Sequence, residues 1–198
     1  HLSTYCLTFE EDTAMSVRLS EGKIQLDVER EAEFYEKAWT LLPEIGYPQY
    51  EISNFSRPGF TCRHNVNTWR MNEWIGYGPG ASSQYKGVRR KNSADLEKWS
   101  YGMGPSREAE YDENFAISEV ELARDSVLFG LRMNEGGCLA DISDRFGLKS
   151  ESFDSIVAFF SKLEDAGMMD QNDGISKLSI EGRMRCDAIA LEIPEIEC

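Results

Sequence analysis

Apolar and polar positions in the first sixty residues predict two strands separated by a helix. Residues 1–9 are rich in β-branched and aromatic side chains and contain no breaker, which predicts a buried strand. Apolar residues then recur every three or four positions from Val28 to Ile45, as in a helix with one buried face. Asp27 is a suitable N-cap, and residues 50–56 predict the second strand. The order strand, helix, strand favours parallel β/α units.

The pattern changes near residue 104, where glycine and proline mark a linker. The stretch 102–105 reads Gly-Met-Gly-Pro, and a cluster of acidic residues follows it at 108–113. We therefore expect a β/α domain over 1–104 and a smaller, mainly helical domain over 105–198.

The C-terminal domain is expected to contain three helices and a hairpin. Ser118 and Glu121 have the spacing of a capping box, which opens a helix that Gly136 and Gly137 should stop. Two further helices follow, and then a hairpin with an Asn-Asp-Gly turn. These helices are expected at 139–146 and 152–167, and the hairpin at 168–179. Three helices and a hairpin are the layout of a winged helix.

Composition and charge narrow the class of protein. Of the 198 residues, 41% are hydrophobic and 28% charged, which is typical of a soluble globular chain and excludes a disordered one. The longest apolar run, 156–160, is far shorter than the ~20 residues of a membrane-spanning helix. The net charge is −14, and residues 101–198 carry 21 acidic against 9 basic side chains. Such a surface repels phosphate backbones, so nucleic acid is a poor partner.

A basic run interrupts this acidity. It contains Lys86, Arg89, Arg90 and Lys91, and it is preceded by Arg57, Arg63 and Arg70. The run is either a solvated face, which is the commoner case, or a site for ligand carboxylates or phosphates. The pattern alone leaves both interpretations open.

The five cysteines show neither a metal-binding nor a disulfide pattern. They are widely spaced, odd in number and without a Cys-x-x-Cys pair, so a reducing cytoplasm is the expected location. The chain opens on His1 instead of Met, with no segment of the leader type. We therefore expect it to be a fragment or a processed product of a longer protein.

Candidate chemistry lies in segments that follow the predicted strands, where the loops of a β/α architecture carry function. The strand-end polar residues are Glu10, Glu51 and Asn54. A predicted loop at 62–69 contains His64, which could ligate iron, move a proton or bind a polar ligand, or could only hold the loop shut. Glycines at 76, 78 and 80 either let the backbone approach a ligand or form a plain turn.

Four stretches, in register with one another, resemble a single family. They are His1-x-Ser3-x-Tyr5-x-Leu7-x-x-Glu10-x-x-Thr13, Tyr50-Glu-Ile-Ser-Asn-Phe55 with Arg57-Pro-Gly59, Cys62-x-His-Asn-x-Asn-x-Trp69, and Gly76-x-Gly-Pro-Gly-Ala-x-Ser83. Through them the chain resembles the radical-SAM proteins related to oxygen-independent coproporphyrinogen III oxidase, and among these the HemW branch of haem chaperones.

The resemblance implies an α/β fold, in which the last β/α units of a partial TIM-like radical-SAM barrel precede a mainly helical, winged-helix-like C-terminal domain. It implies that the intact protein binds S-adenosylmethionine and a 4Fe-4S cluster, and handles haem or a porphyrin for a haem-accepting protein. The family's Cys-x-x-x-Cys-x-x-Cys motif is absent from this sequence. The cluster cysteines are therefore expected upstream of His1, and this chain alone should not hold the cluster.

The resemblance also implies particular contacts. Haem or porphyrin contacts are implied at Cys62, His64, Asn65 and Trp69, and backbone contacts with S-adenosylmethionine at Gly78, Gly80, Ala81 and Ser82. Two positions depart from the family pattern: Thr68 replaces a usual tyrosine, and Ser82 replaces the histidine of Gly-Pro-Gly-Ala-His-Ser. Ligation of haem through that second histidine is impossible here, which leaves His64 as the main candidate for an axial ligand.

Alternatives to a haem chaperone remain open at this point. The related activity is oxidative decarboxylation of coproporphyrinogen III, and a different class is a non-catalytic winged-helix interaction module. DNA binding by such a module is disfavoured because the helix that would enter the groove carries Glu151, Asp154, Glu164 and Asp165 against the single Lys162.

Overall fold

The fold is that of a computed structural model, which describes residues 1–6, 9–11, 13–104 and 109–197. The contacts divide the chain into two compact units: unit 1, His1–Cys62, and unit 2, Arg63–Cys198. The domain boundary expected at 104/105 falls inside unit 2.

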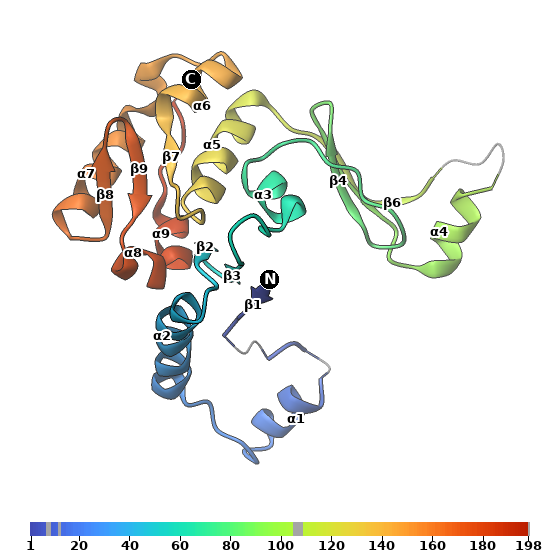
Figure 1. Cartoon of the computed structure of the whole chain (residues 1–198). Helices are drawn as coiled ribbons and strands as arrows, with labels where there is room; N and C mark the ends of the chain where they lie inside the picture. Colours follow the sequence, from blue (N-terminus) through green and yellow to red (C-terminus); the bar gives the residue numbers. More distant parts are fainter. Residues whose placement is uncertain (7–8, 12, 105–108, 198) are drawn as a thin grey trace. The chain divides into compact units, whose positions relative to one another are not determined.

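Unit 1 combines two helices with a small antiparallel sheet (Figure 1). Its elements are β1 (Leu2–Ser3), α1 (Ala14–Ser20), α2 (Val28–Glu44), β2 (Gln49–Glu51) and β3 (Asn54–Phe55). The strands lie in the order β1-β3-β2, and both pairs are antiparallel. The prediction of parallel β/α units is therefore wrong for the described residues of this unit.

The strand predicted over 50–56 is a tight hairpin. Ile52 and Ser53 form its turn, and the Glu51 carboxylate accepts a hydrogen bond from the Ser53 backbone N–H at 3.0 Å. A side chain that bonds to nearby backbone in this way offers the chain an alternative to continuous strand pairing. The first predicted strand is also shorter than expected: its ladder covers Leu2–Ser3, and Leu2 is 39% exposed instead of buried. Residues 7 and 8 lie outside the described residues.

Helix α2 confirms the helix predicted from apolar spacing. The Asp27 side chain caps it by accepting a hydrogen bond from the Arg30 N–H at 3.0 Å. The Tyr35 hydroxyl donates to the Ile52 carbonyl at 3.1 Å, which attaches the helix to the hairpin turn. No residue of α2 is fully buried, so its apolar face is only partly covered.

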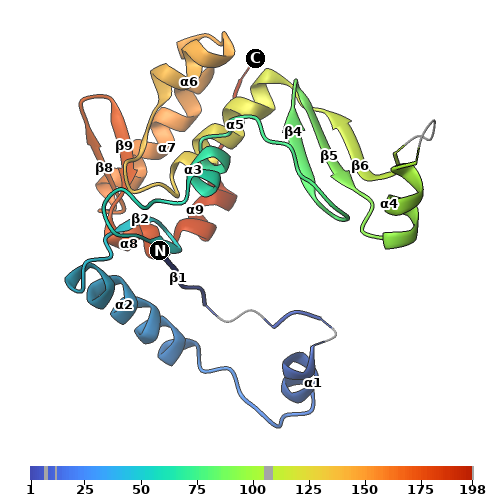
Figure 2. The same ribbon diagram turned by 45° about the vertical axis from the view of Figure 1, so that its right-hand side comes forward.

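Unit 2 begins with α3 (Arg63–Trp69) and continues into an antiparallel sheet (Figures 1 and 2). The strands of this sheet are β4 (Ser82–Tyr85), β5 (Val88–Asn92) and β6 (Tyr111–Ala116), in that order, and α4 (Leu96–Gly102) connects the last two. The expected boundary at 104/105 thus lies between two strands that pair with each other, whereas the compact units divide at Cys62 and Arg63.

The rest of unit 2 contains the predicted helices and hairpin. The elements are α5 (Glu119–Gly130), β7 (Gly137–Cys138), α6 (Leu139–Phe146), the 3-10 turn η1 (Ser150–Phe153), α7 (Asp154–Asp165), β8 (Met169–Asn172), β9 (Ile175–Leu178), α8 (Ile180–Met184) and α9 (Cys186–Glu192). Ser118 and Glu121 form the predicted capping box. Helix α5 ends at Gly130, earlier than predicted, because the chain then turns into β7, whose Gly137 pairs with Ser176.

The core of unit 2 is built from these C-terminal elements. Helices α5 and α7 and the hairpin β8–β9 lie next to one another in Figure 2, and β7 completes the sheet in the order β7-β9-β8. The buried apolar side chains include Ala123, Val127, Phe153, Ile156, Phe160, Met169 and Leu178. Each large side chain of this kind contributes about 1.5–3 kcal/mol by leaving water, so this core holds the helices in place.

Candidate functional site

Unit 1 contains a buried polar cluster at its hairpin. Glu51 and Asn54 are buried, and the Asn54 side-chain amide donates to the Glu51 carboxylate. The Ser3 hydroxyl donates to Asn54 Oδ1 at 2.5 Å. Two of the three predicted strand-end residues therefore meet, while the third, Glu10, is exposed and accepts a hydrogen bond from the Thr13 hydroxyl through its backbone carbonyl.

The phenol of Tyr35 lies against the turn of the same hairpin. Burial raises the pKa of Tyr35 above its ordinary value, because the phenolate would lose its hydration. The hydroxyl therefore remains a hydrogen-bond donor to the Ile52 carbonyl over the physiological pH range.

The Cys-x-His-Asn motif lies on a helix, so the prediction of a loop at 62–69 is wrong. Helix α3 includes His64, Asn65 and Trp69, and Cys62 directly precedes it. No glycine or proline interrupts residues 60–75, and the packing of Trp69 on Phe129 of α5 supports the helix. The hydroxyl of Thr68, which replaces the usual tyrosine, donates a hydrogen bond to the His64 carbonyl at 3.0 Å.

Helix α3 separates its candidate ligands around the helix axis. Asn65 and Trp69 are four residues apart and half-buried, so they share a face, whereas His64 is exposed. The Trp69 ring stacks on Phe129 of α5 with centroids 5.6 Å apart, and the Arg132 guanidinium lies 4.8 Å from the indole centroid. His64 is thus accessible to an incoming ligand, while Trp69 also anchors α3 to α5.

The glycine-rich turn is tied to its sheet through its own backbone. The predicted backbone contacts are Gly78, Gly80, Ala81 and Ser82. The Gly80 N–H donates to the Ser93 carbonyl at 3.0 Å, and the Asn92 side chain donates to the Gly78 carbonyl at 2.8 Å. Gly78 and Gly80 have φ values of +101° and +68°, which other residues rarely adopt. Several polar groups of the turn therefore already have protein partners.

Short polar contacts connect α3 with this turn. The Asn67 side chain donates to the Glu73 carbonyl at 3.1 Å, and the Glu73 carboxylate accepts from the Lys86 N–H at 2.7 Å. Trp74 forms an antiparallel β-bridge with Gln84 through its backbone, and its indole N–H donates to the Ser82 carbonyl at 3.1 Å. The His64 motif and the glycine-rich turn therefore belong to one connected segment of unit 2.

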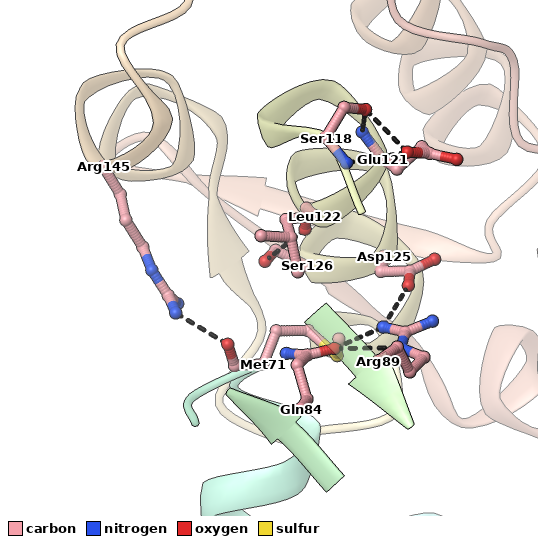
Figure 3. A network of polar contacts seen from close by, with 9 residues as sticks. All are labelled: Met71, Gln84, Arg89, Ser118, Glu121, Leu122, Asp125, Ser126 and Arg145. Carbon is pink, nitrogen blue, oxygen red and sulfur yellow. Dashed lines mark hydrogen bonds and ion pairs between the residues drawn. The ribbon is translucent and has the colours of Figure 1, made fainter. Parts of the chain in front are cut away.

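Arg89 links the first sheet of unit 2 to α5. Figure 3 shows its guanidinium between Gln84 of β4 and Asp125 of α5, and its bond to the Asp125 carboxylate is 2.8 Å long. The Arg89 and Asp125 side chains are only 27% and 21% exposed, so solvent screens this pair less than a surface pair. Lys91 pairs with Glu113 at 3.8 Å. Half of the basic run is thus neutralised within the protein.

Sequence reasoning missed Arg145, which contacts the residues that follow Trp69. Arg145 of α6 donates to the carbonyls of Arg70 and Met71, just after α3, at 2.8 and 2.7 Å, and Figure 3 shows the bond to Met71. Arg70 pairs with Glu135 at 2.7 Å. The partners are 65 to 75 positions apart in the sequence, so no local pattern could have revealed them. The available signal was an arginine in the last turn of a short amphipathic helix.

The described parts of the chain contain no group of three or more His, Cys, Asp or Glu side chains that could hold a metal ion. Cys6, Cys62, Cys138 and Cys186 form no disulfides. None of the helices in the described ranges has the length and apolar character needed to span a bilayer.

Comparison with known proteins shows clear relatives. No protein-family model matches the chain. The "Heme chaperone HemW" of Lactococcus lactis is 31% identical over 147 residues, which cover 74% of this chain and 38% of that protein. The "Radical S-adenosyl methionine domain-containing protein 1, mitochondrial" of Danio rerio is 32% identical over 150 residues, which cover 69% of this chain and 32% of that protein. The "Heme chaperone HemW" of Synechocystis is 34% identical over 144 residues, which cover 69% of this chain and 34% of that protein.

A solved structure shares the fold. It is described as "Coproporphyrinogen III oxidase (HemN) from Escherichia coli is a Radical SAM enzyme", and it matches with a TM-score of 0.66 at 15% identity, over 89% of this chain and 44% of that chain. The chain spans less than half the length of each of these relatives.

Proposed function

Because this chain is a HemW-like relative of the radical-SAM proteins, we propose that it takes part in binding and transferring haem or a related porphyrin. The observation that carries the proposal is helix α3, which presents an exposed histidine beside Asn65 and directly after Cys62. An exposed imidazole on a short, anchored helix is suited to a cargo that must be taken up and released. Two relatives named as haem chaperones, at 31% and 34% identity, support this interpretation.

We assign His64 the role of axial haem ligand, since a neutral imidazole is a common ligand of haem iron. Asn65 and Trp69, on the adjacent face of α3, would contact the porphyrin edge, and Cys62 is the lesser ligand candidate. Cys62 lies in unit 1, directly before the first residue of α3.

The described residues do not fit a 4Fe-4S cluster, because they contain no group of three metal-binding side chains. We propose that cysteines outside these 198 residues hold the cluster in the longer protein. The glycine-rich turn fits an S-adenosylmethionine contact better. Nothing lies within 4 Å of the place where a Cβ would stand at Gly78, so an adenine could approach the backbone there.

We further propose that α5 to β9 form a winged helix that serves as a docking surface for a haem-accepting protein. The order helix, strand, helix, helix, hairpin, with β7 paired to β9, supports this arrangement. The exposed side of α7 carries Asp154, Glu164 and Asp165, which favours a protein partner over a nucleic acid.

Titration with haemin tests the axial role of His64. We expect a shifted Soret band, and His64→Ala should weaken haemin binding by at least about tenfold, because the iron loses its protein ligand. His1→Ala is the matched control, since it removes the other histidine of the chain. A Soret shift and affinity that His64→Ala leaves unchanged would contradict the role given to this residue.

The oxidase alternative predicts a different result. In the longer protein, under anaerobic and reducing conditions, an oxidase would release carbon dioxide from coproporphyrinogen III. We expect no such release, and its observation would replace the chaperone proposal by an enzymatic one.

A further inference from the structure

A cavity of about 560 Å³ lies within unit 2, next to Trp69. Its walls come from the end of α3, from Gly130 of α5, from β7 and from α6, and they include Ile142 and Arg145. This volume is within the range of sites that bind small molecules and cofactors, roughly 300–1,000 Å³. His64 is not among the lining residues that the structure describes, so the cavity is a separate feature of the unit.

One wall of the cavity includes an aromatic side chain, Trp69. Trp69 stacks on Phe129 and carries Arg132 beside it, so the indole is held rigidly. Its buried ring N–H has no hydrogen-bond partner among the described residues. This nitrogen is buried, so a ligand in the cavity would contact the exposed part of the Trp69 side chain and not its N–H.

The part of the wall that comes from α6 offers a cation. The Arg145 guanidinium has five N–H donors, and it uses two of its nitrogens to hold the carbonyls of Arg70 and Met71. No carboxylate of the described residues lies within salt-bridge distance of it, whereas Arg70 is paired with Glu135. Arg145 therefore keeps both charge and donors for an anionic group.

The remaining walls limit what kind of anion fits. Asp141 and Glu135 also line the cavity, so its two arginines are matched by two acids. The two carboxylates would repel a small dianion such as free phosphate. Such an ion would also gain nothing from the apolar side chains of Met133, Ile142 and Ile175. The walls suit a largely apolar, flat ligand with one carboxylate at its edge.

We propose that this cavity binds the propionate-bearing edge of a tetrapyrrole, with the carboxylate on Arg145 and the ring system against Trp69. The inference rests on the proposed function and deepens it, because it adds a pocket for the organic ring to the axial contact at His64. Since the pocket recognises the macrocycle and its carboxylate, it should also bind a porphyrin without iron.

A space-filling variant tests the cavity. Gly130 is the last residue of α5 and lines the cavity, and nothing lies within 4 Å of the position its Cβ would take, so Gly130→Leu should place its side chain in part of the cavity. We expect metal-free protoporphyrin IX, followed by tryptophan fluorescence quenching, to bind at least about tenfold more weakly to this variant. The control is Ala158→Leu, which adds the same side chain at an exposed position of α7. Circular dichroism checks that both variants are folded.

A change in the ligand tests the carboxylate contact without altering the protein. The dimethyl ester of protoporphyrin IX should bind more weakly than the free acid, and Arg145→Met should abolish this preference, because the ester cannot accept a charge-assisted bond. Equal affinity of Gly130→Leu and the unaltered chain for protoporphyrin would overturn the cavity assignment, as would equal affinity for acid and ester. If haemin still binds in that case, the proposed function survives. If neither haemin nor protoporphyrin binds, both fail.

Discussion

At the scale of single residues, unit 2 uses charged side chains to join elements that are distant in the sequence. Arg89 reaches from β5 to Asp125 of α5, and Arg145 reaches from α6 to the end of α3. Both arginines hold segments that carry the proposed ligand contacts. Since the bonds of Arg89 to Asp125 and of Arg145 to Met71 are half-buried, their loss should be measurable as a change in stability.

We expect Arg89→Met to lower the free energy of unfolding by about 1–3 kcal/mol, because Asp125 and Gln84 lose their partner away from bulk water. Urea unfolding measures the change, and a double-mutant cycle with Asp125→Asn isolates the pair. Arg90→Met is the matched control, because Arg90 is exposed on the same strand and donates to Asn114. Equal effects of the two substitutions would show that the ion pair adds nothing.

The hydrogen bonds of Glu121 should make the stability of the folded chain depend on pH. The backbone N–H and hydroxyl of Ser118 donate to the Glu121 carboxylate, which holds its pKa below the ordinary value of 4.5. The pKa of Glu121 is lower in the folded chain than in the unfolded chain, so these hydrogen bonds stabilise the fold fully at pH values above the ordinary pKa. The stabilisation is lost as the pH falls through the lowered pKa of the folded chain.

The variant Glu121→Gln should therefore melt at a lower temperature than the unaltered chain at pH 7, and the difference should shrink in acid. Thermal unfolding at several pH values measures it. The control is Glu119→Gln, which removes the same charge from the same helical turn without touching the capping box. A difference that stays constant with pH would contradict the bond between Ser118 and the ionised carboxylate.

At the scale of elements, the sequence predicted what depends on local pattern. Helix α2, the capping box of α5, the helices α6 and α7, and the hairpin β8–β9 all follow from apolar spacing, caps and a turn sequence. The errors occur where a tertiary or side-chain contact decides the structure. Glu51 turns a predicted strand into a hairpin, and the packing of Trp69 on α5 accompanies a helix where a loop was expected.

The candidate site shows the same division. The positions of His64, Asn65 and Trp69 in the motif were visible in the sequence, but their distribution around α3 depends on the helix. Arg145 could not be predicted, because its partners lie more than seventy residues away. Local patterns therefore located the segment that is proposed to bind, and long-range contacts supplied the walls of the cavity.

At the scale of the whole molecule, charge decides between two uses of the C-terminal helices. The net charge is −14, and the exposed acidic residues include Glu151 of η1, Asp154 at the start of α7 and Asp165 at its end. A helix that enters a DNA groove must replace counterions with Lys or Arg, and each acidic residue opposes that exchange. The helix order by itself would permit DNA binding, so the acidity is the feature that should prevent it.

This argument can be tested by reversing the charge. Fluorescence anisotropy with a labelled duplex of about 30 base pairs in about 50 mM salt should show no binding by the unaltered chain. The combined variant Glu151→Lys, Asp154→Lys and Asp165→Lys should gain weak binding that decreases steeply with salt, because α7 would then supply cations to the phosphates. Salt-dependent binding by the unaltered chain would contradict the assignment of a protein-docking surface. Failure of the lysine variant to bind would show that shape, and not only charge, keeps α7 from DNA, and would contradict the winged-helix arrangement.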